Sequence, residues 1–196
     1  MNRSDLKNSA KKAITGKIGI LLAIYIVAAI IMMAIGSLTY CVGGILIAGG
    51  YMLSISTIYL SIVNKNKKPA VEDLLIGFKN GNFTRGLLGY IRYEIFVFLW
   101  SLLLVVPGII KALAYSQMFF LLADNPKLSA AEAQKKSISM MDGRKGELFV
   151  LYLSFIPWLL LVGISFGLAA IYVAPYMKAT LAEYYNSLKK ADKVKK

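Results

Sequence analysis

The chain has 196 residues, of which 58% are hydrophobic and 17% charged, and its 23 Lys and Arg against 10 Asp and Glu give a formal net charge of +13. Soluble domains are usually about 45 to 50% apolar and about 25% charged, so this composition indicates an integral membrane protein. With no His and one Cys, the chain lacks the residues for a Ser-His-Asp or Cys-His catalytic system, a zinc cluster or an intrachain disulfide.

The amino-terminal third predicts two membrane-spanning helices. An apolar run at 18–35 follows a basic leader and is longer than the roughly 7 to 15 residues of a signal-peptide core. We interpret it as a retained membrane anchor, although Ala34-Ile35-Gly36 leaves cleavage open as an alternative. A second run at 42–63 follows after a short uncharged turn at 36–40. Two helices joined this closely predict an antiparallel hairpin.

The apolar stretch at 87–123 is too long for one ordinary span of about 20 residues. Pro107 and Gly108 lie near its middle. Because Pro removes a backbone donor and Gly relaxes the backbone, this pair predicts a break between two spans, at 87–106 and 109–123.

The last apolar stretch, at 148–188, is also long enough for two spans. Pro157 and the segment from Gly163 to Gly167 fall where a turn would be needed. The stretch therefore predicts a third hairpin, with spans at 148–162 and 164–188.

The placement of Lys and Arg predicts the orientation of these spans. Basic clusters precede the first hairpin, separate the hairpins and follow the last one, whereas the three predicted tips carry none apart from Lys111. Positive charges concentrate on cytoplasmic loops near span ends. We therefore expect an all-α polytopic protein of the cell membrane, forming one domain over 1–196, with six transmembrane helices in three hairpins and both termini in the cytoplasm.

Each predicted hairpin follows a short segment with helical spacing of its apolar residues. Leu6, Ala10 and Ile14 keep this spacing before the first hairpin, and the segment 71–78 keeps it before the second. Before the third, Ser129-Ala-Ala-Glu132 is a capping box that opens a helix. We interpret the three segments as cytoplasmic amphipathic helices that lie on anionic lipid headgroups. Ordinary solvated linker helices are the alternative.

Part of the chain resembles a known family. The motifs follow in order from Leu99 to Tyr185: Trp100 to Ser116 around Pro107-Gly108, Leu122 to Pro126, Glu132 to Gly143, Leu153 to Trp158, Ala174 to Tyr176, and Tyr184-Tyr185. In these motifs the chain resembles small integral membrane proteins of unknown function, found mainly in Gram-positive bacteria. More distantly it resembles the membrane domain attached to some glycerophosphodiester phosphodiesterases, whose catalytic domain has no counterpart here. The resemblance supports the topology and implies no activity.

Four ionisable residues fall inside the predicted spans, namely Arg92, Glu94, Lys178 and Glu183. A charge in the bilayer costs about 2.5 to 3.5 kcal/mol on insertion scales, so such residues are functional candidates. Depths along antiparallel helices, at about 1.5 Å per residue, pair Glu94 with Lys178 and Arg92 with Glu183. Pro175 would bend the last span beside this charged niche. The niche is then a structural ion-pair clasp, a substrate or ion site, or a set of snorkelling side chains.

Small residues spaced four apart predict close packing between helices. They occur as Gly44 with Ala48, Gly50 with Ser54, and Gly163 with Gly167. No Walker loop, dinucleotide fingerprint or carboxylate cluster is present in the sequence, so no enzymatic activity, metal or cofactor is expected.

We therefore expect a non-enzymatic membrane protein that organises or binds lipids or a membrane partner. Such a role would fit envelope stress or tolerance of membrane-active peptides. The expected partners are anionic headgroups at the cytoplasmic face and a membrane protein or a second copy of this chain. Nucleic acid is not expected, because one-sided placement in a membrane explains the positive charge. The alternative is a small oligomeric transporter or channel that uses the charged niche.

Overall fold

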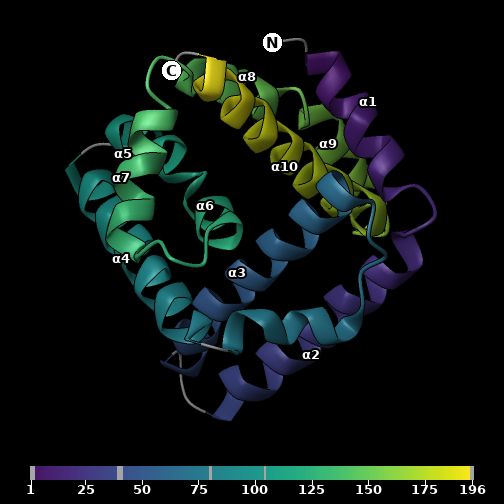
Figure 1. Ribbon diagram of the computed structural model, residues 1–196. Helices are drawn as coiled ribbons and strands as arrows, with labels where there is room; N and C mark the ends of the chain where they lie inside the picture. The colour runs from purple at the N-terminus through teal and green to yellow at the C-terminus, as the bar shows by residue number, and fades with distance from the viewer. Residues whose placement is uncertain (1–2, 39–41, 80, 104, 195–196) are drawn as a thin grey trace.

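The computed structural model describes residues 3–38, 42–79, 81–103 and 105–194, and its regular elements are all helical (Figure 1). They are α1 (Arg3–Ile14), α2 (Ile18–Leu38), α3 (Val42–Lys65), the 3-10 helix η1 (Val71–Phe78), α4 (Asn82–Leu103), α5 (Val105–Tyr115), α6 (Met118–Asp124), α7 (Ala130–Met140), α8 (Lys145–Leu153), α9 (Ile156–Ile164) and α10 (Ala170–Val194). The predicted all-α fold is confirmed. Part of the first predicted tip, 36–40, lies outside the described residues.

Helix α3 runs through the centre of the fold and contacts α1, α2, η1, α4, α6 and α10 (Figure 1). It crosses α4 at Gly49, which lies against Gly86. A Cβ atom added to Gly49 would stand under 3.0 Å from the carbonyl group of Gly86 and the amide nitrogen of Leu87. Only glycines therefore allow the two backbones to approach this closely.

A second close approach joins α3 to η1. The Ser54 hydroxyl donates a hydrogen bond of 2.7 Å to the carbonyl of Leu74 and accepts one of 2.8 Å from the amide of Gly77. Gly77 in turn lies against the carbonyl of Gly50. The predicted packing at Gly50 and Ser54 is thus confirmed.

The other predicted small-residue faces show no comparably close approach at their glycines, although Ala48 is buried. A Cβ atom added at Gly44, Gly163 or Gly167 would meet no atom within 4 Å among the described residues. Spacing alone does not distinguish a helix face that contacts protein from one that points outward, because small residues are common on both in membrane helices.

Three helical stretches are long and apolar enough to cross a membrane: Gly43–Lys65, Val105–Asp124 and Lys145–Ile164. A fourth is added if α1 and the described start of α2, which meet at a bend of 84°, count as one span. A membrane protein is therefore supported by length and composition. Arg92 and Glu94 make α4 less apolar than these stretches.

Pro107 does not end a helix, contrary to the prediction. It lies in the first turn of α5, where its missing N–H would have no helical partner in any case. Helix α4 is described to Leu103 and α5 from Val105. Gly108 packs closely on Ser101 of α4, so the two helices are in tight contact at this end.

The predicted span 148–162 is a broken helix. Pro157 lies at the start of α9, after the short turn that separates α9 from α8. The chain then turns at 165–169, where Gly167 has a φ of 90°. As a result, the last helix begins at Ala170 and not at 164.

The three predicted amphipathic segments are helical. Helix α1 buries Leu6, Ala10 and Ile14, as its spacing predicted, and packs on α10. Helix α7 opens with the predicted capping box, in which Ser129 accepts a hydrogen bond from the Glu132 amide and the Glu132 carboxylate accepts one of 2.8 Å from the Ser129 amide. The hydrogen bonds from Ser129 hold the pKa of Glu132 below its usual value.

Two of the three lysines of α1, Lys7 and Lys11, contact protein where a lipid-facing surface was expected. The Lys7 ammonium donates a 2.9 Å hydrogen bond to the carbonyl of Ser154, at the break between α8 and α9. It also lies over the Phe155 ring, and the Lys11 ammonium lies over Trp158. Both lysines therefore hold α1 against this break.

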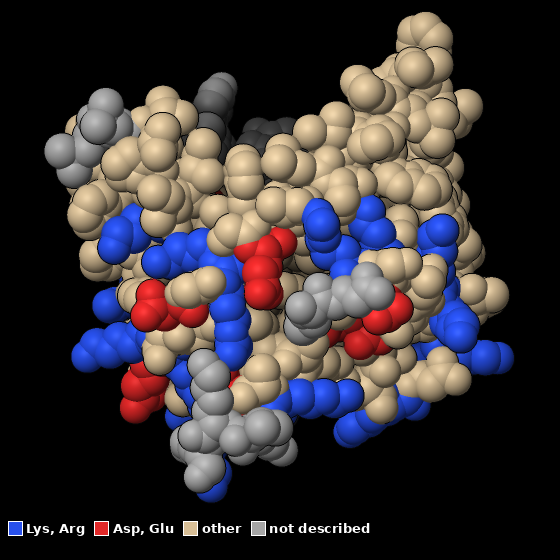
Figure 2. All heavy atoms as spheres, turned by 90° about the horizontal axis from the view of Figure 1, so that it is seen from above, with Lys and Arg blue, Asp and Glu red and all other residues tan. Residues whose placement is uncertain are grey.

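Charged and apolar side chains are separated on the molecule. On the face shown in Figure 2, Lys, Arg, Asp and Glu gather in the lower half and the upper half is apolar or uncharged. The most exposed large apolar residues lie near the described end of α4, at the start of α5 and around the α9–α10 turn, with Phe166 98% and Leu102 74% exposed. Exposed apolar surface of this kind suits contact with lipid.

Candidate functional site

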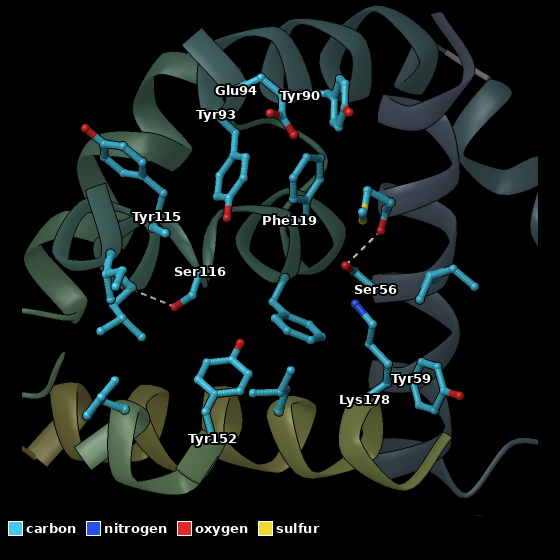
Figure 3. A pocket seen from close by; sticks show the side chains of 18 residues that line it. Ser56, Tyr59, Tyr90, Tyr93, Glu94, Tyr115, Ser116, Phe119, Tyr152 and Lys178 are labelled. Atoms are coloured by element: carbon cyan, nitrogen blue, oxygen red, sulfur yellow. Dashed lines mark hydrogen bonds between the residues drawn. The ribbon is translucent and has the colours of Figure 1, made fainter. Parts of the chain in front are cut away.

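A cavity of about 450 Å³ is bounded by α3, α4, α5, α6, α8 and α10 (Figure 3). Its lining is rich in aromatic rings, namely Tyr59, Tyr90, Tyr93, Tyr115, Phe119, Phe120, Phe149 and Tyr152. Most of the remaining lining is aliphatic. Among the residues that line it, Glu94 and Lys178 alone are charged.

Glu94 enters the cavity from α4. Figure 3 shows its carboxylate between the side chains of Tyr90 and Tyr93, with the Phe119 ring close by. The rings in this wall contact one another: Tyr93 lies 6.5 Å from Phe119 and 6.4 Å edge-on from Tyr115, between ring centroids. Tyr90, Tyr93 and Glu94 are neighbours because a helix places residues three and four apart on one face.

Lys178 enters the same cavity from α10. Its ammonium group points toward Ser56 of α3, and Tyr59 lies beside the base of its side chain (Figure 3). Within the part of the chain that the structure describes, it forms no ion pair and donates no hydrogen bond. Pro175 lies inside α10 one turn earlier, so the carbonyl of Ile171 has no helical N–H partner there.

The predicted ion pairs are not formed. Glu94 and Lys178 line one cavity, but the described residues contain no salt bridge between them. Arg92 donates a 3.1 Å hydrogen bond to the Gln134 side chain, and Glu183 lines a separate hollow between α1, α3 and α10. Depth along a helix gives the height of a side chain but not the direction in which it points, which turns by about 100° per residue.

The ion pairs that do occur lie in the charged segments. Lys67 binds Asp73 at 3.3 Å and Arg144 binds Asp192 at 3.1 Å. Asp124 binds Lys189 and accepts a 2.9 Å hydrogen bond from the Tyr185 hydroxyl. Among the described residues, no group of three or more Asp, Glu or Cys is placed to hold a metal ion.

Arg85 is an anchoring residue that sequence reasoning missed. Its guanidinium donates hydrogen bonds of 2.9 to 3.0 Å to the carbonyls of Leu122, Asn125 and Leu128. It therefore fixes the end of α6, and with it the Phe119 wall of the cavity. In the sequence, Arg85 is one of several basic residues between two apolar runs, and nothing local distinguishes it.

The chain matches the model of a family described as "Protein of unknown function (DUF975)", over residues 1–112 and 102–192. The two ranges cover almost its whole length, so it belongs to this family, and the expected membership in a family of unknown function is confirmed. No curated protein and no solved structure matches the chain. The likeness to the membrane domain of glycerophosphodiester phosphodiesterases stays a prediction.

Proposed function

We propose that this member of the DUF975 family binds a lipid-like amphiphile in its central cavity and does not transform it chemically. The observation that carries the proposal is the lining, which combines apolar and aromatic walls with two charged groups from different helices. The volume of about 450 Å³ lies within the roughly 300 to 1,000 Å³ of small-molecule sites. An amphiphile has an apolar part and a charged part that match this division.

The state of Lys178 supports an anionic group on the ligand. A cation among apolar helices is costly unless another group compensates it. Among the described residues, Lys178 has no such partner, although the cavity gives an incoming group room to reach it. A bound headgroup would supply the missing acceptor.

The lining also supports binding without catalysis. The two serines that line the cavity, Ser56 and Ser116, donate hydrogen bonds to the carbonyls of Met52 and Leu113 within their own turns. A serine nucleophile needs an adjacent base, and the chain contains no His. The cavity therefore favours a carrier or sensor of the amphiphile over a lipid-modifying enzyme.

Filling the cavity should remove bound lipid. Ala112 lines the cavity from α5, whereas Ile110 on the same helix is 44% exposed and lies outside the lining. We expect the purified Ala112→Trp variant to lose most of the lipid that co-purifies with the wild-type protein, as measured by mass spectrometry of the organic extract. Ile110→Trp should retain it. Equal lipid content in both variants, with both folded by circular dichroism, would contradict the proposal.

We further propose six membrane crossings with both termini in the cytoplasm of the cell. The basic clusters flank the apolar helices, and the α9–α10 turn carries no charge. Anionic headgroups at the cytoplasmic face are then the expected partners of the basic segments. A membrane protein or a second copy of the chain stays a further expected partner.

Cysteine labelling tests this topology. In a Cys41→Ser background, a cysteine at Phe166, which is 98% exposed, should react with an impermeant thiol reagent in intact cells. Cysteines at Lys65 and Lys127 should react only after lysis. Labelling of the Lys127 site from outside would reverse the orientation, and protection of the Phe166 site would show that the last hairpin enters the membrane without crossing it.

A further inference from the structure

We infer that the cavity selects a zwitterionic headgroup, with an amine held at Glu94 and a phosphate held at Lys178. This inference rests on the proposed function and specifies its ligand. It follows from the two charges, which face one cavity from different helices without pairing with each other among the described residues (Figure 3).

The Glu94 side of the cavity suits an ammonium group. The carboxylate lies beside Tyr90 and Tyr93, and the Phe119 ring approaches Tyr93 at 6.5 Å (Figure 3). Aromatic faces carry partial negative charge and attract cations within about 6 Å. A carboxylate among aromatic rings combines ionic and cation–π attraction, and it offers an alkyl ammonium both a counter-charge and apolar contact for its methylene groups.

The Lys178 side suits a phosphate. The ammonium carries three donors and binds phosphate as a point charge. Ser56, toward which it points, donates its own hydrogen to Met52, so that hydroxyl can only accept here. The Lys178 side of the cavity thus presents a single positive charge, which matches a monoanionic phosphodiester better than a group of higher charge.

A ligand with a single charge would leave either Glu94 or Lys178 without a counter-charge. Lys178 is partly buried and Glu94 is exposed, so leaving a charge without a counter-charge costs more at Lys178 than at Glu94. A purely anionic lipid would satisfy Lys178 and place its negative charge in the same cavity as Glu94. A purely cationic lipid would do the reverse. The zwitterion alone satisfies both groups, and this is the source of the expected selectivity.

The test compares three short-chain diacyl lipids on the detergent-purified full chain by native mass spectrometry. One carries a phosphoethanolamine headgroup, one a phosphoglycerol headgroup, and one an ammonium group without phosphate. We expect the phosphoethanolamine lipid to bind about tenfold more tightly than either of the others, equivalent to about 1.4 kcal/mol. Glu94→Gln should remove this preference over the phosphoglycerol lipid. Lys178→Met should remove the preference over the ammonium lipid.

Matched controls separate the cavity charges from charge in general. Glu183→Gln removes an acid that lines a different hollow, and Lys111→Met removes a lysine whose ammonium lies 4.5 Å from the Trp100 ring centroid outside the cavity lining. Both should leave the order of affinities unchanged. An equal loss of preference in these controls would overturn the assignment of the amine to Glu94 and the phosphate to Lys178.

The remaining outcomes distinguish the two proposals. If all three lipids bind equally and Glu94→Gln changes none of them, the headgroup inference fails while lipid binding stands. If none binds and Ala112→Trp retains its co-purified lipid, the proposed function fails as well. Free phosphoethanolamine in solution should not displace the lipid at equal concentration. Full displacement would show that the ligand is a soluble zwitterion and not a lipid.

Discussion

The Gly49→Ala substitution should destabilise the protein more than the addition of one methyl group usually does. The added Cβ atom would stand under 3.0 Å from backbone atoms of Gly86 and Leu87, and backbone atoms in two packed helices cannot rotate away as a side chain does. Overpacking costs about 1 to 3 kcal/mol, and we expect the upper end here. The midpoint of thermal unfolding in detergent should fall by roughly 6 to 12 °C.

Gly44 provides the matched control because it lies in the same helix, five residues earlier. A Cβ atom added at Gly44 would meet nothing within 4 Å among the described residues. Ala favours a helix over Gly by about 1 kcal/mol, so Gly44→Ala should leave the unfolding temperature unchanged or raise it. If Gly49→Ala behaves like Gly44→Ala, the crossing of α3 and α4 is looser than the structure has it.

The helical elements could be predicted because they depend on local properties of the chain. A long apolar run needs its backbone groups paired internally once it enters a membrane, and a helix achieves this within the segment. The capping box at Ser129 and Glu132 and the buried face of α1 were predicted for the same reason. Each depends on residues within one or two turns of one another.

The ends of several helices could not be predicted with the same certainty. Proline occurs both within the first turn of a helix and directly after a break between two helices. Pro107 lies inside the first turn of α5, while Pro157 lies at the start of α9 after a real interruption. Both positions tolerate Pro for the same physical reason, the absence of an N–H partner in a first turn. The sequence around a Pro indicates that a helix begins nearby, but not how far the preceding helix extends.

The cavity was beyond sequence reasoning because membrane helices are apolar on every face. Tyr90 and Tyr93 line the cavity, whereas Tyr184 and Tyr185 are buried in the packing, yet both pairs fit an interfacial belt equally well in sequence. Lipid and protein interior differ little in polarity, so the hydrophobic pattern does not reveal which side of a helix contacts protein. Charged residues were therefore the only part of the site that sequence could indicate.

Loss of the Arg85 side chain should also lower the stability of the protein strongly. In the Arg85→Met variant, the carbonyls of Leu122, Asn125 and Leu128 and the side chain of Asn82 lose a charged donor. Hydrogen bonds to charged groups contribute about 1.5 to 3 kcal/mol each. Because Arg85 is only half-buried, we expect a total loss of about 3 kcal/mol. Hydrogen exchange should also accelerate in α6 and the loop after it.

The Lys variant determines whether charge or geometry is responsible. Arg85→Lys retains the positive charge, but one ammonium cannot reproduce the planar fork that reaches three carbonyls on different sides. Its unfolding temperature should therefore lie closer to that of Arg85→Met than to the wild type. Arg92→Met, in the same helix, removes one hydrogen bond to Gln134 and a cation–π contact with Phe96, and should cost about 1 kcal/mol. Full recovery in Arg85→Lys would show that the end of α6 needs only a nearby positive charge, and the cavity wall at Phe119 would then not depend on the guanidinium geometry.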